Sequence, residues 1–143
     1  MRKVFIDCNE RIPCNPCEFT CKFGAILIGP NLTELPQTNS DLCIGCGACV
    51  AACPGQACFL IDENVDDGYS TIDFPYEFFP IPVVGEFVTA CDNEGIDVCS
   101  GQVEYISANA SYSLTKVIRI RVPSKYVRLI RGIKRKLRES DII

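Results

Sequence analysis

The fold of this 143-residue chain is decided by one stretch, Cys43-Ile44-Gly45-Cys46-Gly47-Ala48-Cys49-Val50-Ala51-Ala52-Cys53-Pro54. Its spacing, C-x2-C-x2-C-x3-C-P, gathers three thiolates around one iron–sulfur cube and directs the fourth cysteine to a second site. Gly45 and Gly47 lie between these ligands, where small residues let backbone N–H groups approach the cluster sulfurs. The stretch therefore predicts a pair of [4Fe–4S] clusters rather than a site for one small metal ion.

An altered version of the same pattern lies upstream, at Cys14, Cys17 and Cys21. Its first position falls on Arg11, which cannot ligate iron, and Cys8 is the expected substitute because the intervening loop is long enough to fold back. Without Cys8, the first site would hold a three-iron cluster or would take a ligand from outside the chain. The predicted ligand sets are Cys8, Cys14, Cys17 and Cys53 for the first [4Fe–4S] cluster, and Cys21, Cys43, Cys46 and Cys49 for the second.

The eleven cysteines favour metal binding over a disulfide scaffold, because their number is odd. The basic start of the chain reaches Asp7 before a secretory signal could form, so a reducing, cytoplasmic compartment is expected. Zinc is disfavoured because its structural sites pair C-x2-C knuckles or include histidine, and the chain has no histidine. The same absence excludes Rieske centres, His-ligated haem and histidine acid–base catalysis, so we expect no substrate turnover by the chain alone.

Three cysteines fall outside the predicted ligand sets. Cys58 stands where an apolar strand should begin, and we expect it to be a small core residue. Cys91 and Cys99 lie in strand-like segments on either side of a turn at 92–95. They could face each other across a hairpin in that arrangement, but packing is the expected role of both.

The sequence predicts an α+β chain in three parts. Residues 1–62 have the βαββαβ-like order of a dicluster module, so small that cluster ligation should supply much of its stability. Residues 63–73 are predicted to be an acidic, solvated linker. Residues 74–143 are predicted to form a small β unit and a C-terminal basic helix that docks a partner. The expected strands are 3–6, 25–28, 32–35, 59–62, 86–91, 96–106 and 115–122, and the expected short helices follow Cys17 and span 48–52.

Two segments of the last part are candidates for docking. Residues 74–82 are aromatic and proline-rich, too broken for a helix and too short for a membrane span. An extended segment packed on the β unit is expected there, with an exposed aromatic docking strip as the alternative. From Lys125 onward an amphipathic helix is expected, with an apolar stripe formed by Tyr126, Ile130, Ile133 and Leu137.

Charge is unevenly distributed along the chain, whose net charge is −4. Residues 1–115 hold 4 Lys and Arg against 16 Asp and Glu, whereas residues 116–143 hold 10 against 2. Nucleic-acid binding is not expected, because most of the molecule would repel phosphates. Membrane binding is only weakly indicated, because the apolar stripe of the expected C-terminal helix is short and lacks tryptophan. Two roles of the basic residues in 116–143 stay open: a solvated basic face, and docking against an acidic partner subunit.

A wider likeness is carried by five segments that extend over nearly the whole chain, at 12–17, 23–26, 43–57, 75–78 and 122–123. In these segments the chain resembles a family of small proteins with a bacterial dicluster ferredoxin-like module that accompany FAD-dependent amino-acid dehydrogenases of the proline and hydroxyproline type. The chain departs from the usual ferredoxin pattern at Lys22, where proline commonly follows the cysteine, and at Arg11. Both departures concern cluster geometry and potential.

The resemblance implies an electron-transfer subunit whose two [4Fe–4S] clusters carry single electrons to or from the flavins of a hetero-oligomeric dehydrogenase. In such complexes the FAD-containing subunit oxidises an amino acid or secondary amine, and the iron–sulfur chain is not catalytic by itself. Two other functions stay open. One is a stand-alone dicluster ferredoxin, and the other is an iron–sulfur redox sensor whose basic helix meets nucleic acid.

Overall fold

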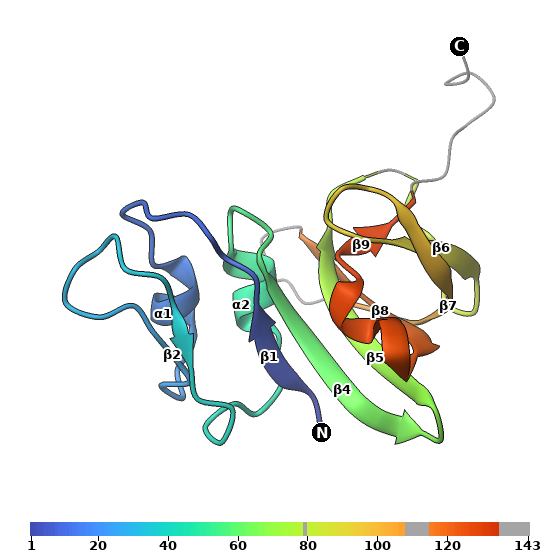
Figure 1. The fold of residues 1–143 in the computed structure, drawn as a ribbon, viewed down its shortest axis with the longest axis horizontal. Coiled ribbons are helices and arrows are strands. Elements are labelled where there is room, and N and C mark those ends of the chain that lie inside the picture. Colours follow the sequence, from blue (N-terminus) through green and yellow to red (C-terminus); the bar gives the residue numbers. More distant parts are fainter. Residues whose placement is uncertain (79, 108–114, 135–143) are drawn as a thin grey trace, which may run out of the picture.

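The computed structural model describes residues 1–78, 80–107 and 115–134 (Figure 1). The helices are α1 (Pro16–Thr20), α2 (Ala48–Ala52) and the 3-10 helix η2 (Ser124–Leu129). The strands are β1 (Lys3–Ile6), β2 (Ile26–Leu27), β3 (Gln37–Thr38), β4 (Cys58–Asp66), β5 (Tyr69–Tyr76), β6 (Phe87–Cys91), β7 (Asp97–Ile106), β8 (Lys116–Pro123) and β9 (Gly132–Ile133). No helix in the described ranges is long and apolar enough to cross a membrane.

One antiparallel sheet connects the two halves of the chain. Its strand order is β1-β4-β5-β8-β7-β6-β9, and β2 and β3 form a separate hairpin. In Figure 1 the two helices and this hairpin lie beside β1 and β4, while β6 to β9 and η2 form the opposite end of the molecule. The long central strands therefore belong to both halves, and the cysteine-bearing part is not an isolated unit.

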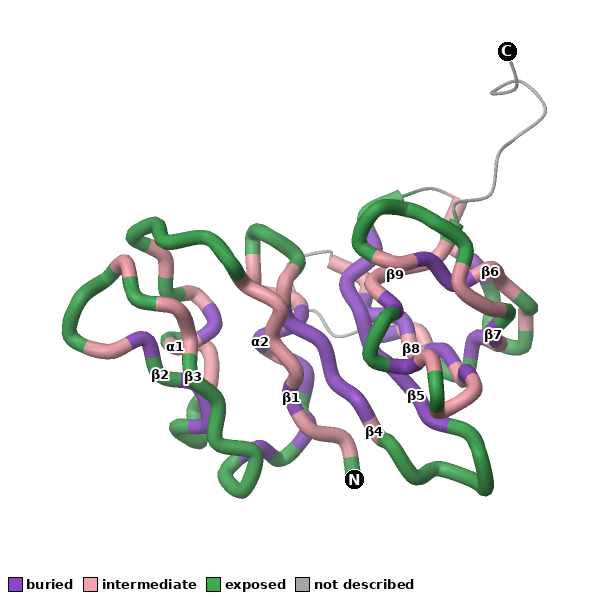
Figure 2. The backbone as a smooth tube through the Cα atoms, in the orientation of Figure 1, coloured by how far each residue is buried: buried purple, intermediate pink, exposed green. Residues whose placement is uncertain are grey.

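The first half of strand β4, residues 58–61, is buried on both faces, and its successive side chains point in opposite directions into two cores. Phe59 and Ile61 pack into a core formed by the curled sheet with η2. Cys58 and Leu60 point to the other face and pack with α1, α2 and β2 in a second core, which also contains several of the predicted ligands. Figure 2 shows the run of buried residues along β4 and β5 between these cores.

The hairpin of the N-terminal half closes later than the sequence predicts. The expected strand at 32–35 is a turn instead, since Asn31 accepts hydrogen bonds at its side chain from the backbone N–H of Thr33 (3.0 Å) and at its carbonyl from that of Glu34 (3.0 Å). Strand β2 pairs with β3 after this turn, with Ile26 opposite Thr38. The first strand and the second helix, by contrast, have the bounds expected from the sequence.

Residues 63–73 form a hairpin, so the predicted acidic linker is wrong for this segment. Strand β4 continues to Asp66, the chain turns at Gly68, and β5 returns alongside it. The acidic side chains of β4 face outward, while Ser70 is buried and bridges to Glu63 and Ser124 through its hydroxyl. Pairing with β8, some fifty residues further on, holds β5 in place.

Residues 125–134 do not form the predicted continuous helix. The 3-10 helix η2 ends at Leu129, and β9 then pairs with β6, with Ala90 opposite Ile133. Gly132 disfavours a helix at this point, and burying Ile130 in the sheet core supplies a tertiary interaction that outweighs the amphipathic pattern. Leu137 and the rest of the predicted helix lie outside the described residues.

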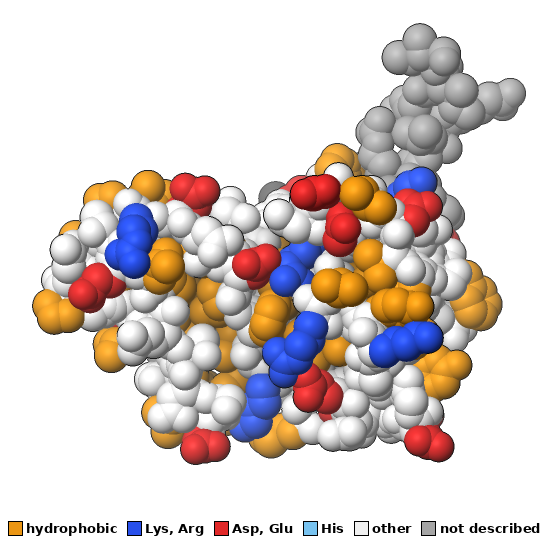
Figure 3. Space-filling view, in the orientation of Figure 1, with side chains coloured by type: hydrophobic (Ala, Val, Ile, Leu, Met, Phe, Trp, Pro, Cys, Tyr) orange, Lys and Arg blue, Asp and Glu red, His pale blue; other side chains and the backbone are white. Residues whose placement is uncertain are grey.

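The basic segment after residue 115 binds the acidic part of its own chain. The carboxylates that it meets come from β4, β5, β7 and the segment after β1, and Figure 3 shows basic and acidic side chains side by side on this face. Arginine and lysine at the surface of the sheet are thus largely neutralised within the chain. The ion pairs of residues 116–134 are Arg119–Asp73, Arg121–Asp66, Arg121–Glu104, Arg128–Glu63, Arg131–Asp7 and Lys134–Asp97.

The aromatic segment after residue 73 is buried up to Tyr76 and exposed at Phe78. Phe74 and Tyr76 are buried in β5 and their rings meet edge to face, with centroids 6.5 Å apart. Phe78 is exposed and contacts Tyr76. Phe79 lies outside the described residues, and of the three described aromatic side chains two belong to the core, in line with the expected extended, packed segment.

Candidate iron–sulfur sites

The first predicted ligand set lines one cavity of about 300 Å³. The cavity lies between the segment after β1, helix α1 and the start of β4, and four of its sulfurs come from Cys8, Cys14, Cys17 and Cys53. A fifth comes from Cys58, the first residue of β4. The donor set suits the group that the spacing implies, because thiolates are the usual ligands of [4Fe–4S] clusters.

The second predicted ligand set lines another cavity, between β1, β2 and the start of α2. Its sulfurs come from Cys21, Cys43, Cys46 and Cys49, and the enclosed volume is about 20 Å³. Apolar side chains such as Val4, Ile26 and Leu60 form the remaining wall. Cys46 is exposed, so a cluster in this position would be shielded from water on the side of these apolar residues only, and the thiols would have to spread apart to admit it.

The two short helices explain why each motif contributes to both cavities. Cys17 and Cys21 lie one helical turn apart, and the backbone N–H of Cys21 donates to the carbonyl of Cys17 at 3.2 Å. Cys49 and Cys53 are related in the same way by α2, at 3.1 Å. Helix α1 thus presents Cys17 to the first cavity and Cys21 to the second, while α2 does the reverse.

Local polar contacts fix the first motif in place. Pro16 begins α1, a position where its missing N–H removes no helical hydrogen bond. Glu18 accepts the backbone N–H of Ile28 at 2.8 Å, which ties α1 to the residue after β2, and this bond lowers the pKa of Glu18. The helix that carries Cys17 is therefore anchored to the hairpin behind it.

Hydrogen bonds favour the thiolate form of several predicted ligands, and thiolate is the form that binds metal. The Cys58 thiol, followed by backbone N–H groups including that of Ala57 at 3.5 Å, lowers the pKa of Cys53 to about 5 against the effect of burial. Contact with Cys58 also lowers the pKa of Cys17 to about 7, and lowers that of Cys49. Burial, with the neighbouring Cys53, Cys17 and Cys8, raises the pKa of Cys14.

Cys58 is the site residue that the sequence analysis missed. It is buried, as expected, but its sulfur faces the other thiols rather than apolar side chains alone. The available signal was its position five residues after Cys53, shortly beyond the turn at Pro54 and Gly55 that ends the motif. Cys91 and Cys99 line neither cavity, and burial raises the pKa of each, as is usual for packing residues.

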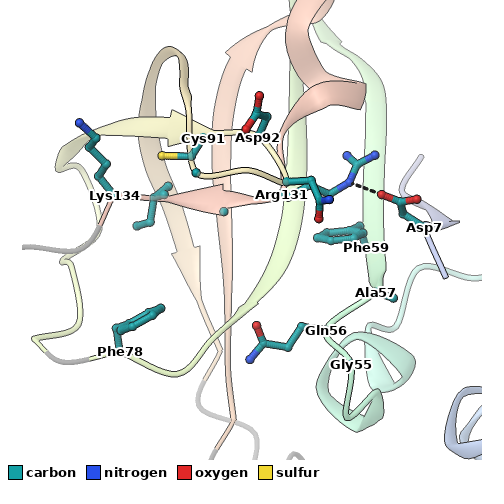
Figure 4. A pocket seen from close by; sticks show the side chains of 14 residues that line it. Asp7, Gly55, Gln56, Ala57, Phe59, Phe78, Cys91, Asp92, Arg131 and Lys134 are labelled. Atoms are coloured by element: carbon teal, nitrogen blue, oxygen red, sulfur yellow. Dashed lines mark hydrogen bonds and ion pairs between the residues drawn. The ribbon is translucent and has the colours of Figure 1, made fainter. Parts of the chain in front are cut away.

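A hollow of about 440 Å³ adjoins the first cavity on the side of β9 (Figure 4). Arg131 points into it and donates from Nε to Asp7 at 2.9 Å, and its guanidinium lies over the rings of Phe5 and Phe59. Asp7 immediately precedes Cys8, and its backbone N–H donates to Ala57 at 2.8 Å. The C-terminal segment thus fixes the base of the loop that carries Cys8.

Strand β1 in turn supports the loop of the second motif. Lys3 donates from Nζ to the carbonyl of Cys43 at 2.8 Å. Gly45 has a φ of +77°, and a Cβ atom there would lie 2.7 Å from the backbone oxygen of Arg2. The loop can therefore approach β1 this closely only because residue 45 has no side chain.

We expect Gly45→Ala to impair loading of the second cavity. The positive φ costs about 1–2 kcal/mol for a residue with a Cβ, and the contact with Arg2 forces the ligand loop away from β1 in addition. Iron content after anaerobic purification and the thermal midpoint measure the effect. Gly24→Ala is the matched control, because its φ is +72° and its Cβ would meet nothing within 4 Å. Equal losses in both variants would contradict a role for the close approach.

No three Cys, Asp or Glu side chains converge as ligands of one metal ion in the part of the chain that the structure describes. The chain is also similar over about a third of its length to curated relatives. "Ferredoxin-type protein NapF" of Escherichia coli (strain K12) is 44% identical over 50 residues, which cover 34% of this chain and 30% of that protein. One component of an ion-translocating oxidoreductase complex of Methanosarcina acetivorans is 46% identical over 46 residues, 32% of this chain and 16% of that protein.

A third relative, "Probable ferredoxin" of Methanosarcina thermophila, is 49% identical over 37 residues, 26% of this chain and 57% of that protein. The matched part spans less than a third of the length of NapF. No solved structure matches the chain. The family described as "4Fe-4S binding domain" matches residues 36–59, which include the whole second motif. Residues 36–59 of the chain therefore form a 4Fe-4S binding domain similar to part of ferredoxin-type proteins, which supports at least one [4Fe–4S] cluster in this chain.

Proposed function

We propose that this chain is the electron-transfer subunit of a multi-subunit, FAD-dependent amino-acid or amine dehydrogenase, and that it carries two [4Fe–4S] clusters. The observation that supports it best is the pair of cavities, each lined by four predicted thiolate ligands drawn from both motifs. Cys17 of one set and Cys49 of the other both contact the sulfur of Cys58. Two centres held this close together suit a relay.

The residues of the chain would have three tasks in such a relay. Clusters of this kind supply one-electron transfer when bound. Apolar side chains around the second cavity exclude water, and backbone N–H groups such as that of Ala57 donate to a ligand sulfur, which favours the more negative, reduced state. Lys3 adds positive charge beside Cys43, whereas Arg131 neutralises Asp7 at the base of the Cys8 loop.

The subunit function is further supported by the extent of the fold. A sheet of seven strands and the core between this sheet and η2 extend well beyond the cysteine motifs, which is more structure than two clusters need for ligation. The resemblance over segments outside the cysteine motifs, at 75–78 and 122–123, favours a flavin dehydrogenase as the partner.

A stand-alone dicluster ferredoxin is the second candidate. One observation favours it: the arginines and lysines of 116–134 that were candidates for docking an acidic partner are mostly paired with carboxylates of this chain. An acidic partner would then have to bind elsewhere, on the basic residues beyond 134 or on a face that uses other chemistry.

Anaerobic co-purification separates these functions. We expect the untagged chain, expressed at its native level in its own host, to elute with a larger, flavin-containing protein and to stay with it in moderate salt. The measurements are the elution volume, the flavin absorption and the iron content of the same fractions. Elution at the mass of a single chain without flavin would contradict the subunit function and leave the stand-alone carrier.

A further inference from the structure

The first cavity holds five thiols, one more than a [4Fe–4S] cluster uses. The fifth, Cys58, occupies the first position of β4, directly opposite Ile6 at the end of β1. The pairing continues by one more bond, from the N–H of Asp7 to Ala57 at 2.8 Å. Cys8 follows at once, so Cys8 and Cys58 enter the cavity from the same end of the β1–β4 pair.

Cys58 is a core residue, but it also lines the first cavity beside predicted ligands. Only 1% of its surface is exposed, and it lines the first cavity together with Cys17 and Cys53, while Cys49 belongs to the same buried core. Two of these are predicted ligands of the first cluster. The second cavity offers no comparable surplus, since the four predicted ligands are the cysteines that line it.

Cys8, the predicted fourth ligand, is less firmly held. It lies in a segment without helix or strand between β1 and α1, is partly exposed, and replaces a motif position that Arg11 occupies. The neighbouring Asp7 is anchored, because its carboxylate accepts from Nε of Arg131 at 2.9 Å. A rigid strand supports Cys58, whereas a loop supports Cys8.

We propose that Cys58 is an exchangeable ligand of the first cluster, able to bind the iron that Cys8 binds. In the exchange, the iron–sulfur bond to Cys8 breaks and one to Cys58 forms. The Cys58 thiol gives up its proton, and the released Cys8 thiolate takes one up, so charge and electrons balance without an oxidant or reductant. The first cluster thus keeps four protein ligands when the Cys8 loop moves away. This inference rests on the two-cluster function proposed above.

Four proteins test the exchange: the wild type, Cys8→Ala, Cys58→Ala and the double variant, all prepared and reconstituted anaerobically. The readouts are iron and sulfide per chain, and the EPR spectrum before and after reduction. We expect about eight irons in the wild type and in both single variants, with an altered signal from one cluster in Cys8→Ala. The double variant should lose one to four irons and show a three-iron signal or none from the first site.

The outcomes separate this inference from the function beneath it. A three-iron signal in Cys8→Ala alone, with about eight irons in the wild type, overturns the exchange and leaves the two-cluster function intact. About four irons in the wild type overturns both. Cys58→Val controls for a folding defect, because valine also fills the core position. The exchange is supported if Cys58→Val alone keeps about eight irons and Cys58→Val combined with Cys8→Ala loses the first cluster.

Discussion

Replacing Cys43 and Cys46 together by alanine is expected to remove half of the iron, from about eight atoms per chain to about four. Both residues line the second cavity, which has no fifth cysteine to take their place. Two remaining thiols, Cys21 and Cys49, are too few to retain a cube. The first cavity keeps all of its sulfurs and should stay loaded.

The EPR spectrum of the reduced double variant tests a second part of this prediction. Two reduced centres close together couple magnetically, so the wild type should give a complex EPR signal and the variant the simpler signal of one isolated centre. Cys91→Ala with Cys99→Ala is the matched control, because it also removes two cysteines but touches neither cavity. Loss of all iron in the Cys43 and Cys46 variant would show that the sites do not load independently. A simple signal in the wild type would contradict the relay.

The sequence predicted those features that short stretches of chain determine. Cys17 and Cys21, like Cys49 and Cys53, are separated by one helical turn, so the spacing alone indicates which sulfur turns toward which cavity. Strand 3–6 and helix 48–52 likewise follow from a few adjacent residues. That the first cavity also holds a cluster stays a prediction.

The features that the sequence did not predict depend on partners far along the chain. Asp66 and Ser70 look like linker residues, yet their segment is a hairpin because β8 pairs with it some fifty residues later. Ile130 and Ile133 match a helical stripe, but burial of Ile130 and pairing of Ile133 with Ala90 place them in a different structure. The local sequence indicates only a core residue at Cys58, because the thiols around it come from separate segments of the chain.

Replacing Asp73 by alanine is expected to give the largest loss of fold stability among the ion pairs of the sheet. Asp73 lies opposite Arg119 in the β5–β8 pair and accepts from its Nε at 2.9 Å and its Nη2 at 3.1 Å. The Asp73 side chain is 6% exposed and that of Arg119 21%, and the guanidinium also lies over the ring of Tyr105. Removing the carboxylate leaves a largely buried, unpaired cation, which costs about 3–5 kcal/mol.

Anaerobic thermal unfolding of the loaded protein, followed by far-UV circular dichroism, measures this loss as a fall in midpoint on the order of 10 °C. Two variants show whether it comes from the stranded charge. Asp97→Ala removes the carboxylate of an exposed pair with Lys134, more than half exposed on both sides, and should cost at most about 1 kcal/mol. Asp73→Leu combined with Arg119→Met removes both charges, and should recover most of the stability because no unpaired ion stays in the sheet. If this double variant were as unstable as Asp73→Ala, the loss would come from the missing ion pair and not from an unpaired arginine. The ion pair itself would then join β5 to β8, and through them the cysteine-bearing half of the molecule to the rest of the sheet.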